Sequence, residues 1–112
     1  MNDVSASHSC TFAAGAVDWN ATVWLNTVQI ASHSGGYSHF TADASANIKP
    51  TANELIVRAY DPSDSGYQVN GKQRISAITK PGGDTYTPTS GIWQTVRYES
   101  ACANCTHVLH FM

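Results

Sequence analysis

The feature of this sequence that most constrains its fold is a two-residue alternation of apolar and polar side chains. Between Asn20 and Asn26 every second residue is apolar, namely Ala21, Val23 and Leu25. Residues 54–60 repeat the pattern with Leu55, Val57 and Ala59. Successive side chains of an extended chain point to opposite faces, so this period predicts strands with one buried face.

Other segments of the chain are also predicted to form strands. Short strands are predicted where β-formers or small apolar residues lie between turn residues, in segments 11–16, 28–31, 40–44 and 92–98. Asn26 and Thr27 would form a hairpin turn. Residues 61–90 are rich in Asp, Gly, Pro and Ser and read as a long loop, in which residues 73–79 can hold a further strand. The tail, residues 107–112, is either a last strand or unpaired.

Composition supports an all-β protein and excludes two classes of partner. Charged residues are only 12% of the chain, and Ser and Thr, which disfavour helix interiors, supply much of the polarity. The net charge of −2 offers no basic surface for nucleic acid. The apolar runs are too short for a membrane span or for the centre of a secretory signal, so we expect no membrane partner and leave the compartment open.

The cysteines and histidines near the end of the chain have zinc-ligand chemistry but the wrong spacing. Cys102, Cys105, His107 and His110 lie in one short segment, whereas a zinc finger separates its two ligand pairs by roughly a dozen residues. Incidental cysteines in a strand tail are favoured, and no metal or cofactor is predicted. Cys10 makes the number of cysteines odd, and the possible glycosylation sites at Asn20 and Asn104 matter only in a secreted protein.

Carboxylates and aromatic residues are the other candidates for function. Asp61, Asp64 and Asp84 could in principle act as a glycosidase acid and base, but loop aspartates more often cap turns. Ser/His/Asp catalysis has no supporting motif. The aromatic residues divide by context: the strand tryptophans favour core or interface positions, and the loop tyrosines favour surface contacts; these are Trp19, Trp24, Trp93, Tyr67 and Tyr86.

Four motifs in order resemble the sugar-binding domain of glycoside hydrolase family 2, which includes β-galactosidases, β-glucuronidases and β-mannosidases. Residues 15–26 (GAVDWNATVWLN) resemble the family's GAVDWEATVWVNG strand, and residues 33–43 resemble HRGGYxPFxxD. Residues 49–62 are similar to KPGENELVVRVxDP, and two later segments, 71–73 and 91–96, match GKQ and GIWQTV. The chain departs from the family at three positions: Thr27 and Thr51 replace glycines, and Arg97 replaces a tryptophan.

The resemblance implies a domain division and a fold. Residues 12–99 would form an antiparallel β-sandwich, a jelly roll of the galactose-binding type, lacking the family's opening strands. Residues 1–11 and 100–112 match nothing in the family. A sandwich without these strands would expose its edges, so self-association, partnering or incomplete folding is expected.

The resemblance also implies a function. The family's catalytic barrel and its two catalytic glutamates have no counterpart, so no catalytic residue is assigned. The expected function is carbohydrate binding and scaffolding, with a β-glycoside or the barrel of a parent enzyme as partner. The long loop supplies the candidate sugar contacts Asp61, Asp64, Tyr67, Lys72 and Gln73. The alternatives are weak glycosidase activity by this chain and a structural or interaction fragment that binds no sugar.

Overall fold

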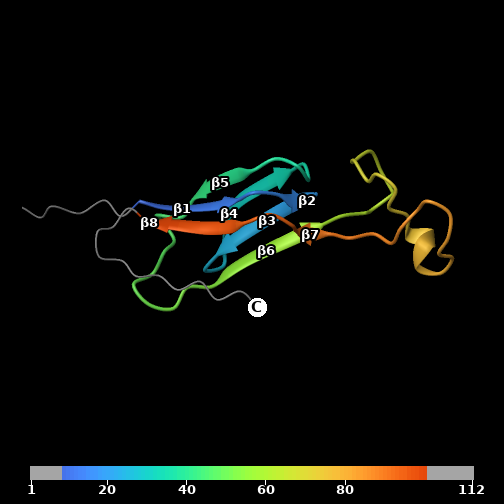
Figure 1. Cartoon of the computed structure of the whole chain (residues 1–112). Helices are drawn as coiled ribbons and strands as arrows, with labels where there is room; N and C mark the ends of the chain where they lie inside the picture. Colours follow the sequence, from blue (N-terminus) through green and yellow to red (C-terminus); the bar gives the residue numbers. More distant parts are fainter. Residues whose placement is uncertain (1–8, 101–112) are drawn as a thin grey trace, which may run out of the picture.

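A computed structural model describes residues 9–100 as an all-β, antiparallel sandwich with one short 3-10 helix (Figure 1). The elements in chain order are β1 (Cys10–Ala14), β2 (Val17–Asp18), β3 (Asn20–Leu25), β4 (Val28–Ser34), β5 (Phe40–Asp43), β6 (Leu55–Tyr60), the 3-10 helix η1 (Ile75–Ile78), β7 (Gly91–Ile92) and β8 (Val96–Ser100). The predicted all-β class and antiparallel sandwich are confirmed.

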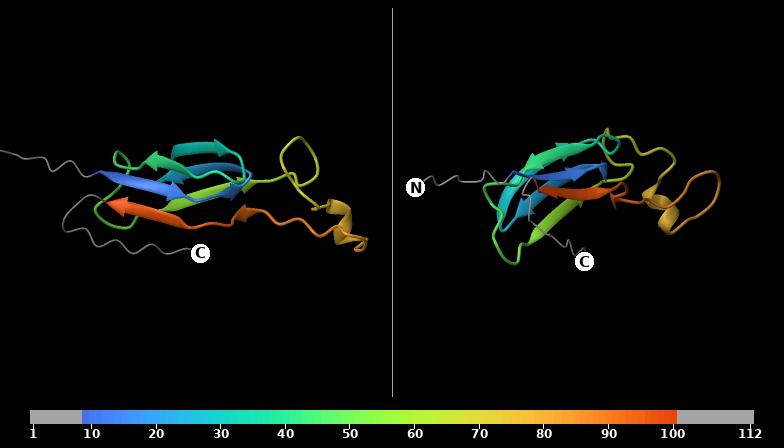
Figure 2. Two further views of the ribbon diagram at one scale, coloured as in Figure 1. Left: turned by 45° about the horizontal axis from the view of Figure 1, so that its top comes forward. Right: turned by 60° about the vertical axis from the view of Figure 1, so that its left-hand side comes forward.

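Two three-stranded layers make up the sandwich. One has the order β5-β1-β8 and the other β4-β3-β6, and all of their pairings are antiparallel. The short pair β2-β7 extends the first layer beyond a break at Gly15, whose backbone N–H donates to the carbonyl of Thr95 at 2.8 Å. The segment between β6 and β7, residues 61–90, projects from one end of the sandwich, and we call it the arm (Figure 2).

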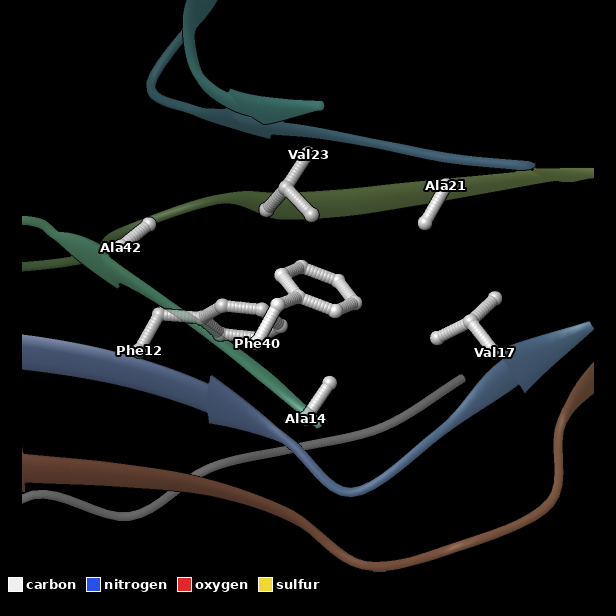
Figure 3. Packing of buried hydrophobic residues seen from close by; sticks show 7 residues of the cluster. All are labelled: Phe12, Ala14, Val17, Ala21, Val23, Phe40 and Ala42. Carbon is white, nitrogen blue, oxygen red and sulfur yellow. The ribbon is translucent and has the colours of Figure 1, made fainter. Parts of the chain in front are cut away.

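The core lies between the two layers, as Figure 3 shows. Its buried residues come from both sides: Phe12, Ala14, Val17, Phe40 and Ala42 face Ala21 and Val23. The rings of Phe12 and Phe40 pack with their centroids 6.0 Å apart. The predicted alternation in β3 is confirmed, because its buried positions are those that the two-residue period placed on one face.

The β3-β4 hairpin turns at Asn26 and Thr27, as predicted. Both residues have positive φ, 49° and 72°, the conformation that a two-residue hairpin turn needs. Asn26 suits it, since its side chain bonds the backbone carbonyl of Asn47, the side chain of Asn53 and the backbone N–H of Glu54. Thr27 is β-branched and exposed, so its positive φ carries a steric cost.

Replacing Thr27 by glycine is therefore expected to stabilise the domain by about 1 kcal/mol, since glycine adopts positive φ without a clash. Urea denaturation at pH 7 measures this change. Asn26→Gly is the matched control: it occupies the same turn but loses three side-chain hydrogen bonds, so it should destabilise. A Thr27→Gly variant no more stable than the parent would show that the turn tolerates threonine without cost.

Two sequence predictions of strands need correction. Residues 73–79 do not form a strand: Gln73 makes one isolated parallel bridge with Tyr86, and the helix η1 follows. This segment has no sheet edge beside it, and Ala77 is its one buried residue among those the structure describes. Residues 92–98 form two strands rather than one, because the chain breaks opposite Gly15 between β7 and β8.

The edges of the sandwich are β4 and β6 in one layer and β5 and β8 in the other. The face of β6 that points away from the core is exposed, with Ile56 47% and Tyr60 51% accessible. These are the edges at which an incomplete sandwich would pair with another chain. Self-association and a shortened N-terminal side both stay predictions.

Several predictions concern segments at the ends of the chain. Cys102, Asn104, Cys105, His107 and His110 lie outside the described residues. Within residues 9–100, Cys10 is a buried free thiol, and no group of three or more His, Cys, Asp or Glu side chains is arranged to hold a metal ion. Among the same residues, no helix has the length and apolar character needed to cross a bilayer.

Candidate functional site

A cavity of about 260 Å³ lies where the arm joins the sandwich. The sandwich contributes Asp18, Gly36, Tyr37 and Trp93. The base of the arm and the start of β7 contribute Gln73, Thr89, Ser90 and Gly91. The cavity thus joins segments that are far apart in the sequence, and its lining is half aromatic or glycine and half hydrogen-bonding.

Strand pairing and a close backbone approach position Asp18. It ends β2, pairs with Gly91 of β7, and precedes the cis peptide bond to Trp19. Gly36 is buried against it: a Cβ atom at Gly36 would lie 2.9 Å from Oδ1 of Asp18. The absence of a side chain at Gly36 therefore lets the loop after β4 lie directly over the carboxyl group.

Trp93 and Tyr37 form the aromatic side of the cavity. The indole Nε1 of Trp93 donates a 2.7 Å hydrogen bond to the carbonyl of Gly36, which anchors the ring to that loop. The ring of Tyr37 meets it edge to face, with centroids 5.6 Å apart. Trp93 is 52% and Tyr37 70% exposed, so much of both rings is open to a ligand. Trp93 was predicted to lie in the core or at an interface; the core position is wrong, because the strand breaks at this residue and its side chain is half exposed, and an interface position stays a prediction.

A pair of carboxyl groups lies beside these rings. The side chains of Asp18 and Asp61 lie near each other and interact electrostatically. Asp61 accepts hydrogen bonds from the hydroxyl of Ser90 and the backbone N–H of Ser63, both at 2.8 Å. Burial, and then the charge of Asp61 and the hydrogen bond to it, raise the pKa of Asp18 above its ordinary value of 3.8.

This raised pKa makes the contribution of Asp18 to stability depend on pH. The folded state holds the Asp18 proton more tightly than the unfolded chain does. Stability is therefore lost as the pH rises from about 3.8 through the folded-state pKa, and the loss is complete above it. Asp18→Asn removes the titrating group, so its stability relative to the parent should be more favourable at pH 7 than at pH 3.

Urea denaturation at the two pH values tests this prediction. Asp43→Asn is a control of opposite sign, because hydrogen bonds from the side chain and backbone of Ser45 lower the pKa of Asp43. Removal of that carboxylate should cost more stability at pH 7 than at pH 3. If Asp18→Asn follows the same trend as Asp43→Asn, the carboxyl pair does not oppose folding.

The structure brings two of the five sequence-predicted contact residues to the cavity. Gln73 lines it, with Oε1 accepting the backbone N–H of Thr89 at 2.6 Å, and Asp61 adjoins it through Asp18. Asp64 instead accepts the N–H of Ile75 at 3.2 Å, where η1 begins. The turn-capping interpretation is confirmed for Asp61, whose Oδ1 accepts the backbone N–H of Ser63 two residues on.

The other two nominated residues lie in the arm and do not line this cavity. Lys72 pairs with Asp84 at 3.3 Å, and both side chains are largely exposed. Tyr67 is fully exposed, as predicted for a loop tyrosine, and so is much of Tyr86. Sugar contact by Asp64, Tyr67 and Lys72 stays a prediction. Sequence reasoning missed Asp18 and Tyr37 as site residues, although both lie inside motifs that it singled out.

A serine and a histidine meet elsewhere without forming a catalytic triad. The hydroxyl of Ser38 lies 3.2 Å from Nε2 of His33, whose ring stacks on Phe40. The other ring nitrogen, Nδ1, is buried and has no hydrogen-bond partner among the described residues. A triad needs an acid at that nitrogen to orient the ring, so this pair does not support acyl-transfer chemistry.

Comparison with known proteins identifies a solved structure of similar fold. No protein-family model matches the sequence, and no match was found among curated proteins. Among solved structures the chain is similar to Faecalibacterium prausnitzii beta-glucuronidase, with a TM-score of 0.56 and 22% sequence identity. The similarity covers 88% of this chain and 20% of the glucuronidase chain. At this identity the likeness establishes an architecture: the chain shares a β-sandwich with about one fifth of a glycoside-cleaving enzyme.

Proposed function

We propose that this chain is a non-catalytic carbohydrate-binding and scaffolding domain of a glycoside hydrolase of family 2. The observation that carries the proposal is the cavity at the arm, in which the exposed rings of Trp93 and Tyr37 stand beside the polar groups of Asp18, Gln73 and Ser90. Aromatic rings stack on the C–H faces of sugars, and carboxylate, amide and hydroxyl groups bond sugar hydroxyls. The family motifs and the sandwich shared with a beta-glucuronidase support the same assignment.

The carboxyl pair favours binding over catalysis. A glycosidase places its two carboxyl groups on either side of the bond to be cleaved, at least about 5 Å apart. Asp18 and Asp61 instead interact with each other, an arrangement unlike two carboxyl groups placed across a glycosidic bond. Asp61 is further occupied by Ser63 and Ser90. This geometry supports a binding site that contacts hydroxyl groups, with hydrolysis assigned to a barrel elsewhere in the parent enzyme.

The arm supports the scaffolding part of the proposal. Large apolar side chains are exposed along it, and these are Tyr67, Val69, Ile75, Ile78 and Tyr86. Among its described side chains only Ala77 is a buried apolar residue. Polar contacts hold the arm together, including hydrogen bonds from the side chain of Gln68 to the carbonyls of Ser63 and Ser65. An apolar projection of this kind suits contact with a second domain, here the catalytic barrel.

Two-dimensional amide NMR of the purified chain tests the binding function. Titration with methyl β-galactoside, methyl β-glucoside and methyl β-mannoside should shift a contiguous set of peaks around Gly36, Gln73, Ser90 and Trp93. Addition of mannitol controls for non-specific effects of polyols. Dispersed spectra that none of the glycosides changes would reject sugar binding and favour a purely structural function for this chain.

A further inference from the structure

We propose that the cavity takes neutral glycosides and discriminates against uronates, the sugars whose C6 is a carboxylate. This inference rests on the proposed function, because it assigns a ligand class to the same cavity. It differs from what the name of the structural neighbour, a beta-glucuronidase, would suggest.

The negative charge at the cavity comes from two aspartates. Asp18 lines the cavity, and Asp61 accepts a 2.8 Å hydrogen bond from the hydroxyl of Ser90, which also lines it. The two aspartates place negative charge beside any bound ligand, and a ligand carboxylate would meet like charge there.

No positive side chain among the described residues lines the cavity to offset this charge. The nearest along the chain, Arg74, follows Gln73 but directs Nη1 to the carbonyls of Gly71 and Gln73 at 3.1 and 2.7 Å. Lys72 pairs with Asp84, and Arg97 pairs with Glu99. Carboxylate recognition in proteins relies on arginine, lysine or converging N–H donors.

The remaining polar groups suit hydroxyls. The hydroxyl of Ser90 already donates to Asp61, which leaves its oxygen as an acceptor. The Oε1 atom of Gln73 accepts the backbone N–H of Thr89, and its amide NH2 group is left to donate. Acceptors at Asp18 and Ser90 with a donor at Gln73 can bond sugar hydroxyls, which both donate and accept. An uncharged hydroxymethyl group at C6 fits this set better than a carboxylate does.

The test compares two ligands that differ only at C6. Methyl β-glucoside and methyl β-glucuronide, and the corresponding galacto pair, are titrated into the chain at pH 7 and followed by amide NMR. Whichever neutral glycoside binds, its affinity should be roughly tenfold or more higher than that of the matching uronide. This difference is the size expected for one like-charge contact near a protein surface. Added salt should narrow the difference, because it screens the repulsion.

Two variants locate the effect. Asp18→Asn keeps the shape and removes the charge, and it should reduce the discrimination to about threefold or less. Asp61→Asn should also reduce the discrimination, so the test can still be made if one of the two variants folds poorly. Asp43→Asn makes the same charge change on β5, opposite the start of β1 rather than near β2, and should leave the discrimination intact.

The outcomes separate the two proposals. Uronides that bind as tightly as the neutral glycosides, or more tightly, would overturn the inference and leave sugar binding standing. A discrimination unchanged in both Asp18→Asn and Asp61→Asn would also overturn it, because the carboxyl pair would then not be its source. Absence of binding by every glycoside to the folded chain would overturn the proposed function, and the inference with it.

Discussion

Replacing Trp93 by alanine is expected to weaken the proposed glycoside binding at least thirtyfold. The indole ring forms the aromatic side of the cavity, is 52% exposed for contact, and is anchored by its hydrogen bond to the carbonyl of Gly36. Removal of the ring also deprives Tyr37 of its edge-to-face partner. Tryptophans at the centre of binding sites commonly contribute about 2 kcal/mol or more, which corresponds to the expected loss. NMR or calorimetric titration measures it.

Two control variants sharpen this result. Trp93→Phe keeps an aromatic face but loses the hydrogen bond to Gly36, so its affinity should fall between those of the parent and the alanine variant. Tyr67→Ala removes a fully exposed aromatic ring from the arm. A loss of binding in Tyr67→Ala, with Trp93→Ala unaffected, would move the sugar site from the cavity to the arm, where the sequence placed it.

Replacing Phe12 by alanine is expected to destabilise the domain by about 3–5 kcal/mol, the usual cost of emptying a buried phenylalanine site. Phe12 is 1% exposed and packs on Phe40 at the centre of the core (Figure 3). Small domains are stable by only about 5–15 kcal/mol, so this change alone should bring the chain close to unfolding. Urea denaturation followed by tryptophan fluorescence measures the change in the free energy of unfolding.

Ile78→Ala is the matched control for this prediction. Ile78 is 63% exposed on the arm, and its truncation should change stability by no more than about 0.5 kcal/mol. Equal costs for Phe12→Ala and Ile78→Ala would contradict a core centred on the two phenylalanines. An unfolded Phe12→Ala variant beside a folded Ile78→Ala variant would instead agree with the large expected cost.

The strands were the predictable part of this protein. The alternation in residues 20–25 determines which side chains of β3 are buried, and Asn26 determines where the hairpin turns, because both depend on local backbone geometry. The long segment between β6 and β7 was also correctly placed. Its internal structure was not: residues 73–79 contain η1 rather than a strand, since contacts distant in the sequence decide it.

The candidate site, too, was predictable from the sequence only in part. Sequence reasoning reached Asp61 and Gln73 through the long loop, and it singled out the motifs that contain Asp18 and Trp93. It expected Trp93 in the core or at an interface, because residues 92–98 were predicted to form one continuous strand. The break opposite Gly15 reverses this outcome, and it follows from a backbone contact between segments about eighty residues apart.

The sequence by itself thus determined the all-β class, the alternating strands and the hairpin, whose physical causes act over a few residues. Only the tertiary structure decided that Asp18 would meet Asp61 and that Tyr37 would meet Trp93 at one cavity. These pairs form because three segments meet beside β2. Strand β7 pairs with β2, the N–H of Trp19 donates to the carbonyl of Tyr60 at the end of β6, and the N–H of Gly35 after β4 donates to the carbonyl of Trp19. A two-residue period records which face of a strand is buried, but it carries no information about which distant loop will lie above it.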